Sequence, residues 1–311
     1  MLRRVALGIA ALSVLMCGCR GPRSEPHVRL VCVGDVMLGR GVAETCAREG
    51  NDYPFEQVAA LLQAGDVTFG NLEAVMTNRE TRFPRVNALR AEPAMAAVLK
   101  QVGFDVMSLA NNHVIDYQRA GLEQCMGLLE AEGIRPVGVG DTLAGAKKGA
   151  VISVSGLRVG FLAYSHFPYT TFIHDPERES ILLLNDEMLR ETVAALAERC
   201  DVVVVSFHWG KEGSRNVSDY ERGLAHLAVE LGADVVVGHH AHVCGEVETY
   251  QGALIAYCLG NLVFDEQSYG GNEGYVLSCD VTRDGVADYS LTQVEVVDGQ
   301  ARIRNGDEGG G

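Results

Sequence analysis

Short apolar runs alternate with amphipathic stretches along most of this chain. Runs rich in Val, Ile, Leu and Phe without polar alternation are typical of strands that are buried on both faces of a sheet. The expected strands cover residues 28–33, 67–69, 104–109, 137–139, 151–154, 157–163, 202–206, 234–237, 246–249, 254–258, 275–281 and 288–297.

Amphipathic stretches between these runs have apolar residues at the helical spacing. The expected helices cover residues 54–63, 92–101, 118–132, 186–199 and 220–231. Strand–helix alternation in the first part and hairpins in the last part predict one α/β domain. We expect a mixed sheet, folded into two sheets and covered by helices.

The first residues have the pattern of an export signal. Arg3 and Arg4 precede an apolar run at 5–16, which is too short to be a membrane-spanning helix of the mature protein. The sequence Leu15-Met16-Cys17-Gly18-Cys19 resembles a bacterial lipobox. An ordinary cleaved signal peptide is the alternative.

The lipobox interpretation divides the chain before its folded part. It predicts a lipoprotein-type signal peptide at 1–18, a lipidated Cys19 and a tether at 19–27. The protein is then an exported cell-envelope lipoprotein, held to the membrane by a lipid anchor on the periplasmic or extracellular face. The glycine-rich end predicts a disordered tail at 301–311.

The charge and the cysteines exclude several classes of protein. A formal net charge of −15 disfavours binding to nucleic acid and to anionic lipid. A polyanionic substrate would need local neutralisation, for example by bound cations. Seven cysteines follow Cys19 without any Cys-x-x-Cys spacing, so neither a disulfide framework nor a cysteine zinc cluster is expected.

Three histidines follow the apolar run at 234–237, in the sequence Gly238-His239-His240-Ala241-His242. The ends of strands in an α/β sheet are where ligands usually bind. Imidazole is the commonest metal-ligating side chain, and two imidazoles at i and i+2 can serve neighbouring metal ions.

Carboxylate, amide or imidazole side chains follow four other expected strands as well. The sequences are Gly34-Asp35-Val36-Met37-Leu38-Gly39-Arg40, Gly70-Asn71-Leu72-Glu73, Asn111-Asn112-His113-Val114-Ile115-Asp116 and His208-Trp209-Gly210. Oxygen and nitrogen ligands without thiolate suit Mn, Fe, Zn, Mg or Ca. A cluster this rich predicts two divalent ions bridged by a carboxylate.

These motifs together resemble the CapA family of poly-γ-glutamate capsule-biosynthesis proteins, within the calcineurin-like metallophosphoesterase superfamily. His208-Trp209-Gly210-x-Glu212 and Leu259-Gly260-Asn261-Leu262-Val263-Phe264-Asp265 complete the set, and the resemblance spans residues 30–282. It implies a four-layer α/β/β/α sandwich over residues 28–300, with the site at the strand ends.

The resemblance also implies a role for each site residue. Two divalent ions, Mn, Fe, Zn or Mg, would share one bridging carboxylate. Glu73 would be this bridge; Asn112, His208 and His240 would hold one ion; Asp35 and His242 the other; His113 would be the general acid and Arg40 a clamp for an anionic group.

Two positions depart from the superfamily pattern. Met37 stands where a histidine ligand is usual, and a thioether is a poor ligand for hard cations. Glu73 replaces an aspartate. Both departures leave open whether two ions bind tightly and whether ordinary phosphoester hydrolysis takes place.

Other side chains near these motifs have two interpretations. Trp209 and Glu212 are expected to line the cleft. For Trp209 the alternative is that it only packs over the site. Residues 165–180 lack periodicity and form either a substrate-selecting loop near the site or an ordinary surface loop. His239 has no expected ligand role and belongs behind the ligands or in the core.

We therefore expect an exported, metal-dependent protein of poly-γ-glutamate or cell-envelope polymer synthesis or export. Its chemistry would be metal-assisted attack on a phosphoryl or amide centre, with His113 assisting the leaving group. The alternatives are a non-catalytic accessory subunit of a membrane synthase and a general exported phosphodiesterase. The partners would be the anionic polymer or a phosphoester, and membrane synthase subunits.

Overall fold

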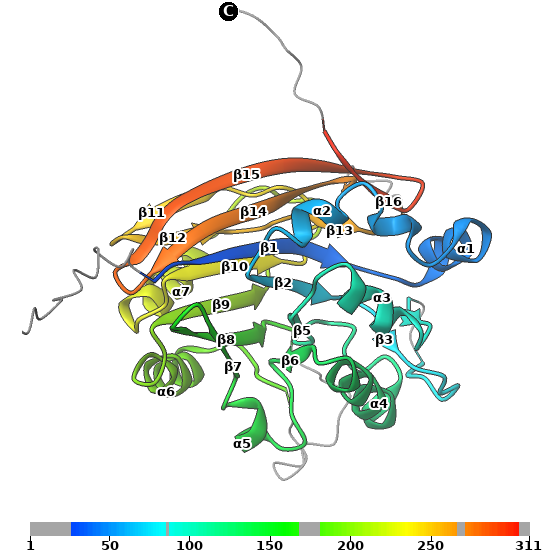
Figure 1. Cartoon of the computed structure of the whole chain (residues 1–311). Coiled ribbons are helices and arrows are strands. Elements are labelled where there is room, and N and C mark those ends of the chain that lie inside the picture. The colour runs from blue at the N-terminus through cyan, green and yellow to red at the C-terminus, as the bar shows by residue number, and fades with distance from the viewer. Residues whose placement is uncertain (1–25, 85–86, 168–180, 266–270, 305–311) are drawn as a thin grey trace, which may run out of the picture.

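The chain folds into two β-sheets that face each other, with helices on both outer surfaces (Figure 1). The computed structural model describes residues 26–84, 87–167, 181–265 and 271–304. The expected signal peptide, Cys19 and most of the tether lie outside the described residues, as does most of the expected loop at 165–180. Within the described residues, no helix is long and apolar enough to cross a membrane.

The first sheet has eight strands in the order β16-β15-β14-β1-β2-β5-β6, with β13 also paired to β1. Its strands are β1 (Val28–Val36), β2 (Val67–Leu72), β5 (Val106–Ser108), β6 (Arg135–Val137), β13 (Asn261–Val263), β14 (Glu273–Thr282), β15 (Gly285–Val297) and β16 (Gln300–Ile303). The centre is parallel, whereas β14, β15 and β16 form an antiparallel meander.

The second sheet has six strands in the order β11-β12-β10-β9-β8-β7. They are β7 (Ala150–Val154), β8 (Leu157–Ser165), β9 (Val202–His208), β10 (Val235–His239), β11 (Val247–Tyr250) and β12 (Ala253–Ala256). A separate pair joins β3 (Val75–Met76) to β4 (Arg90–Ala91).

Helices cover the outer face of each sheet. They are α1 (Arg40–Glu49), α2 (Ala59–Leu62), α3 (Met95–Gln101), α4 (Gln118–Ala131), α5 (Leu143–Ala146), α6 (Asp186–Ala197) and α7 (Asp219–Glu230), with a 3-10 turn at Tyr53–Phe55. In Figure 1, α3 and α4 lie beside the first sheet, and α6 and α7 lie beside the second.

Three hydrophobic cores correspond to these layers. One lies between the sheets, where Phe69 of β2 stacks on Phe161 of β8 with ring centroids 5.9 Å apart. A second packs α1, α3 and α4 on the first sheet, and a third packs α6 and α7 on the second. The expected four-layer α/β/β/α sandwich is therefore confirmed.

Several expected elements were wrong in detail. The expected helix at 54–63 is a 3-10 turn followed by the short α2, and the helix at 92–101 begins only at Met95, after Pro93. The glycine-rich segment after β1 predicted only a turn, but it leads directly into α1. The side chains of Val42 and Cys46 in this helix are buried. Residues 301–303 belong to β16 rather than to a disordered tail, because they pair with β15.

Candidate metal centre

Strand register brings Asp35 to the middle of the site. Asp35 lies near the end of β1, where it is paired with Asn71 of β2 on one side and Asn261 of β13 on the other. In the second sheet, His208 at the end of β9 is paired with His239 at the end of β10. These parallel strands end at one edge, so their polar side chains gather between the two sheets.

The turn that carries the histidines has a strained backbone. His240 has φ 87° and His242 has φ 57°, both in the left-handed region that non-glycine residues rarely occupy. Strain of this kind costs on the order of 1–3 kcal/mol per residue and is concentrated at functional sites. The amide N–H of His240 donates to Oδ2 of Asp35 at 3.1 Å, which joins this turn to the first sheet.

Glycine lets the strands approach each other closely behind this turn. A Cβ atom on Gly238 would lie 1.8 Å from the carbonyl oxygen of Tyr257, and one on Gly34 would lie 2.1 Å from that of Gly260. Both glycines are therefore needed for the backbone packing that places the histidines.

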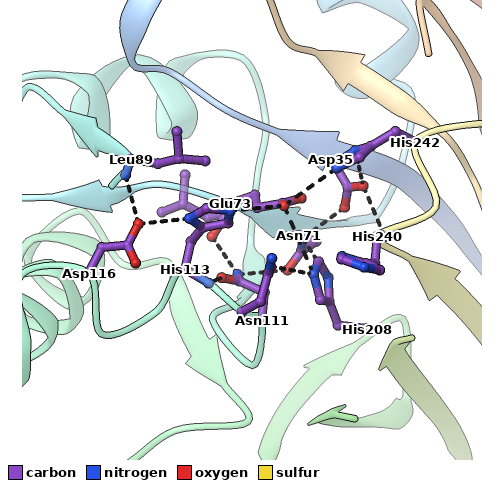
Figure 2. Close-up of polar contacts among 12 residues, drawn as sticks. Asp35, Asn71, Glu73, Leu89, Asn111, His113, Asp116, His208, His240 and His242 are labelled. Atoms are coloured by element: carbon purple, nitrogen blue, oxygen red, sulfur yellow. Dashed lines mark hydrogen bonds and ion pairs between the residues drawn. The ribbon is translucent and has the colours of Figure 1, made fainter. Parts of the chain in front are cut away.

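Glu73 lies at the centre of the site, directly after β2 (Figure 2). Its Oε1 is 3.9 Å from Nε2 of His113, 4.0 Å from Nε2 of His208 and 3.7 Å from Nε2 of His242. These separations are too long for hydrogen bonds. They suit ligand atoms that surround a shared metal ion.

Two groups of three ligands share the Glu73 carboxylate. One group is Glu73, His208 and His240, and the other is Asp35, Glu73 and His242; within each group the ligand atoms lie within 4.8 Å of one another. The amide oxygen of Asn112 lies 2.9 Å from Nε2 of His208, beside the first group. The structure thus brings together all six residues that the resemblance implies as ligands.

Glu73 and His240 contain buried polar atoms without hydrogen-bond partners. In the described part of the chain, such atoms are Oε1 and Oε2 of Glu73 and Nδ1 of His240. Burial, followed by the nearby Asp35 carboxylate, raises the pKa of Glu73 well above its usual value. A buried, unpaired carboxylate is costly unless a cation neutralises it, so this donor set fits a divalent metal.

The imidazoles have distinct protonation preferences in the metal-free site. Burial lowers the pKa of His208 well below its usual value, and burial followed by repulsion from His242 lowers that of His240 to about 3. Both rings are therefore neutral, the form in which imidazole can bind a metal. Although burial opposes it, attraction to Glu73 and Asp35 raises the pKa of His242 to about 10, so a metal would displace its proton.

A chain of amides holds the ligands in place. Nδ2 of Asn71 donates to Oδ1 of Asp35 at 2.8 Å, and Nδ2 of Asn111 lies 3.1 Å from Oδ1 of Asn71. Asn261 accepts from Nδ1 of His242 at 2.9 Å, which aims the other ring nitrogen at Glu73. Sequence reasoning assigned these three asparagines no role. Their positions inside the motifs were the available signal.

His113 is positioned by Asp116. Its Nδ1 lies 2.7 Å from Oδ2 of Asp116, and that oxygen also accepts the N–H of Leu89 at 2.7 Å. The other nitrogen, Nε2, faces Glu73 (Figure 2). His113 therefore presents one fixed nitrogen to the site, an arrangement that suits proton transfer. The sequence pattern places Asp116 in a motif but assigns it no role.

Met37 and Arg40 do not face the ligands. The sulfur of Met37 accepts the N–H of Gly39 at 3.1 Å, and its side chain packs in the core under α1. Arg40 pairs with Asp265 and lies over the ring of Phe264, 5.7 Å from its centroid. Arg40 is thus near the site but already bound to a carboxylate.

The structure places the residues that had two interpretations. Trp209 is buried, stacks on Phe207 and donates to the carbonyl of Tyr257 at 3.0 Å, so it packs behind the site. His239 is also behind the ligands, with Nε2 3.2 Å from the carbonyl of Val33. Exposed Glu212 forms a further ligand group with His240 and His242.

Described residues at the start of the expected loop contact the site, and the N–H of His166 donates to the carbonyl of His208 at 3.0 Å. The Phe167 ring centroid lies 4.1 Å from that of His240 and 5.8 Å from that of His208. Phe167 therefore packs against both imidazoles. Residues 168–180, which carry most of this expectation, lie outside the described part.

Two facing sheets with a buried carboxylate–imidazole cluster at their strand ends define an α/β protein with a candidate divalent-metal centre. The chain belongs to the family described as "Bacterial capsule synthesis protein PGA_cap", which matches residues 29–266.

Sequence similarity to known proteins supports the same family assignment. The PGA biosynthesis protein CapA of Bacillus subtilis (strain 168) is 29% identical over 267 residues, covering 85% of this chain and 70% of that protein. The capsule biosynthesis protein CapA of Bacillus anthracis is 31% identical over 252 residues, covering 78% and 61%. A probable polyglutamine synthesis accessory protein of Mycobacterium tuberculosis (strain ATCC 25618 / H37Rv) is 26% identical over 297 residues, covering 80% and 77%.

One of two similar solved structures supports the fold. A hypothetical protein from Thermus thermophilus aligns with a TM-score of 0.55 at 16% identity, covering 86% of this chain and 100% of that one. The calcineurin-like phosphoesterase YfkN from Bacillus subtilis aligns with a TM-score of 0.47 at 15% identity, covering 90% and 89%. The TM-score of the Thermus thermophilus protein exceeds 0.5, and because its sequence identity is low it supports the fold alone.

Proposed function

We propose that this chain is an exported, lipid-anchored, metal-dependent hydrolase of poly-γ-glutamate capsule synthesis or export. Its family and its CapA relatives support the capsule assignment. The apolar leader and Cys19 support export and anchoring. The reaction would be cleavage at a phosphoryl or amide centre of an anionic substrate.

One observation carries the enzymatic part of this proposal. Glu73 is almost fully buried, its two oxygens lack hydrogen-bond partners, and both ligand groups share its carboxylate. Protonated His242, 3.7 Å away, offsets only one charge of the Glu73 and Asp35 carboxylates, whereas divalent cations would neutralise both. The second group contains the Asp35 carboxylate as well, so the centre suits two divalent ions.

The chain's own residues then act on substrate around this centre. Divalent metal, when bound, would polarise the substrate and supply a nucleophile at neutral pH. Asp116 fixes His113 so that Nε2 can donate a proton to the leaving atom. Phe167, which packs against His240, would help to exclude water on that side. Neutral His208 and His240 keep their ring nitrogens available as ligands.

Metal content is the first test. The purified chain, supplied with Mn²⁺, Zn²⁺ or Fe²⁺, is compared by elemental analysis with Asp35→Ala, His240→Ala and the control His226→Ala. His226 is a partly exposed histidine bound to Glu248, outside the ligand groups. About two ions per chain are expected, falling in both site variants and unchanged in the control.

Other results would change the proposal. One ion that is lost only with His240→Ala would mean that Met37 has disabled the Asp35 position. If no metal binds under any supply, the hydrolase proposal fails. Hydrolysis of bis(p-nitrophenyl) phosphate that His240→Ala abolishes would favour a general exported phosphodiesterase.

A non-catalytic accessory subunit is the second candidate. Met37 lacks the ligand chemistry of the usual histidine, and its sulfur is already bound to the Gly39 N–H. The Mycobacterium tuberculosis relative is itself described as a probable accessory protein. Copurification with a membrane synthase that survives His240→Ala and metal removal would favour this candidate.

A further inference from the structure

A surface hollow of about 380 Å³ lies beside the candidate metal centre. Side chains from four separate segments line it. We call it the arginine hollow, and the residues that matter here are Arg40, Arg82, Arg90, Tyr117, Glu80 and Glu92.

Chain connectivity joins this hollow to the His113–Asp116 pair. Arg90 directly follows Leu89, whose N–H donates to Oδ2 of Asp116 at 2.7 Å. Tyr117 directly follows Asp116. Two residues that line the hollow are therefore direct chain neighbours of the residues that position His113.

Arg40 connects the hollow to the other side of the centre. Phe264, over which the Arg40 guanidinium lies, packs on the His242 ring with centroids 4.7 Å apart. Arg40 itself has φ 46° at the start of α1, a left-handed conformation. The strained backbone is consistent with a position held for function rather than for stability.

Two of the three guanidiniums are available for a ligand. Among the described residues, no ion pair joins Arg82 or Arg90 to a carboxylate, whereas Arg40 pairs with Asp265. The guanidinium of Arg90 lies over the Tyr117 ring, 5.9 Å from its centroid, which restricts its orientation.

The charge of the hollow is opposite to that of the protein. Three arginines and two glutamates give it a formal charge of about +1, in a chain whose net charge is −15. Most of the acidic surface repels an anionic chain, whereas the guanidinium groups of this hollow attract it. Arginine binds carboxylates with two parallel hydrogen bonds.

We propose that the arginine hollow binds the side carboxylates of a γ-linked glutamate chain whose reacting group lies in the metal centre. Arg82 and Arg90 would each hold one carboxylate, and Arg40 would guide the chain from the hollow to the centre. The identity of this ligand rests on the proposed function. The existence of an anion subsite rests on the hollow alone.

The test is binding of a short, fluorescently labelled γ-linked glutamate oligomer, measured by anisotropy at low salt. The chain is used both metal-loaded and chelator-stripped. Arg82→Ala/Arg90→Ala is expected to weaken binding at least about tenfold in both states. Added salt should weaken wild-type binding more steeply than binding to the double variant.

The chain contains a matched control. A second hollow, of about 430 Å³, is lined by Arg158 and Arg283, and both of these arginines pair with Asp201. Arg158→Ala/Arg283→Ala likewise removes two positive charges and should change binding by less than about twofold. Equal losses in both variants would overturn the proposal, because net charge would then explain them.

The outcomes also separate this proposal from the proposed function. No binding to wild type, or unchanged binding to the double variant, overturns the hollow whatever the metal content. Tighter binding of polyphosphate of matched length overturns the carboxylate assignment. Binding lost in the double variant supports the hollow even if no metal binds and the hydrolase proposal fails.

Discussion

The carboxylate of Asp116 lies 2.7 Å from Nδ1 of His113, and both side chains are buried. The same oxygen also accepts the N–H of Leu89, so it holds the ring and the neighbouring segment together. This contact fixes which imidazole nitrogen faces Glu73. The orientation of His113, the proposed proton donor, therefore does not depend on metal.

Asp116→Asn should therefore impair catalysis without removing metal. An amide in place of the carboxylate neither fixes the same tautomer nor stabilises the imidazolium. We expect kcat for hydrolysis of the phosphoryl or amide substrate to fall by about 10²–10⁴, with little change in KM or metal content. Glu123→Gln, an exposed change on α4, is the control. An unchanged kcat would exclude His113 as the proton donor.

Glu73→Gln should stabilise the metal-free protein but make the metal-loaded protein less stable than the wild type. In the metal-free protein it removes a buried carboxylate without hydrogen-bond partners. The free energy of unfolding should then rise by about 1–3 kcal/mol. With saturating Mn²⁺ the wild type should be the more stable, because only it gains binding energy. Urea unfolding of both proteins with and without metal tests both expectations. If metal raises the free energy of unfolding equally in the two proteins, Glu73 has no metal role.

Asp234 should make stability depend on pH. Burial raises its pKa to about 6, although the N–H of Val203 donates to it at 2.8 Å. Between about pH 4 and pH 6 the folded chain holds a proton that the unfolded chain has lost, so this residue lowers stability as pH rises.

Asp234→Asn should consequently be stabilising at pH 7 and neutral near pH 4. The expected gain at pH 7 is about 1–3 kcal/mol, since Asn can still accept from Val203. Urea unfolding of both proteins at the two pH values measures it. A gain that is equal at both pH values would show that ionisation of Asp234 is not its cause.

Gly238→Ala should disrupt the histidine turn. Its Cβ would lie 1.8 Å from the Tyr257 carbonyl oxygen, so β10 or the chain after β12 must move. We expect a loss of at least about 3 kcal/mol of stability, together with loss of metal. Gly127→Ala on α4, where no atom lies within 4 Å of the new Cβ, should instead stabilise by about 0.5–1 kcal/mol. Normal metal content in Gly238→Ala would contradict this role.

Much of the site was predictable because its residues follow buried strands. Asp35, Glu73, His208 and His240 each come at or just after a β-branched run, and parallel strands end at a common edge. The pattern could not assign Asn71 and Asn261, whose roles depend on being paired in register with Asp35. It also missed α1, because glycines precede that helix in the sequence.

Local sequence was enough to specify the order of the elements, the layered α/β class and the residue types at the strand ends. These follow from periodicity, which acts over a few residues along the chain. Only the folded chain shows that Met37 turns into the core, that Trp209 packs behind the site, and that Arg90 and Tyr117 line one hollow. Such contacts depend on register and strained turns between segments far apart in sequence, and local patterns do not specify them.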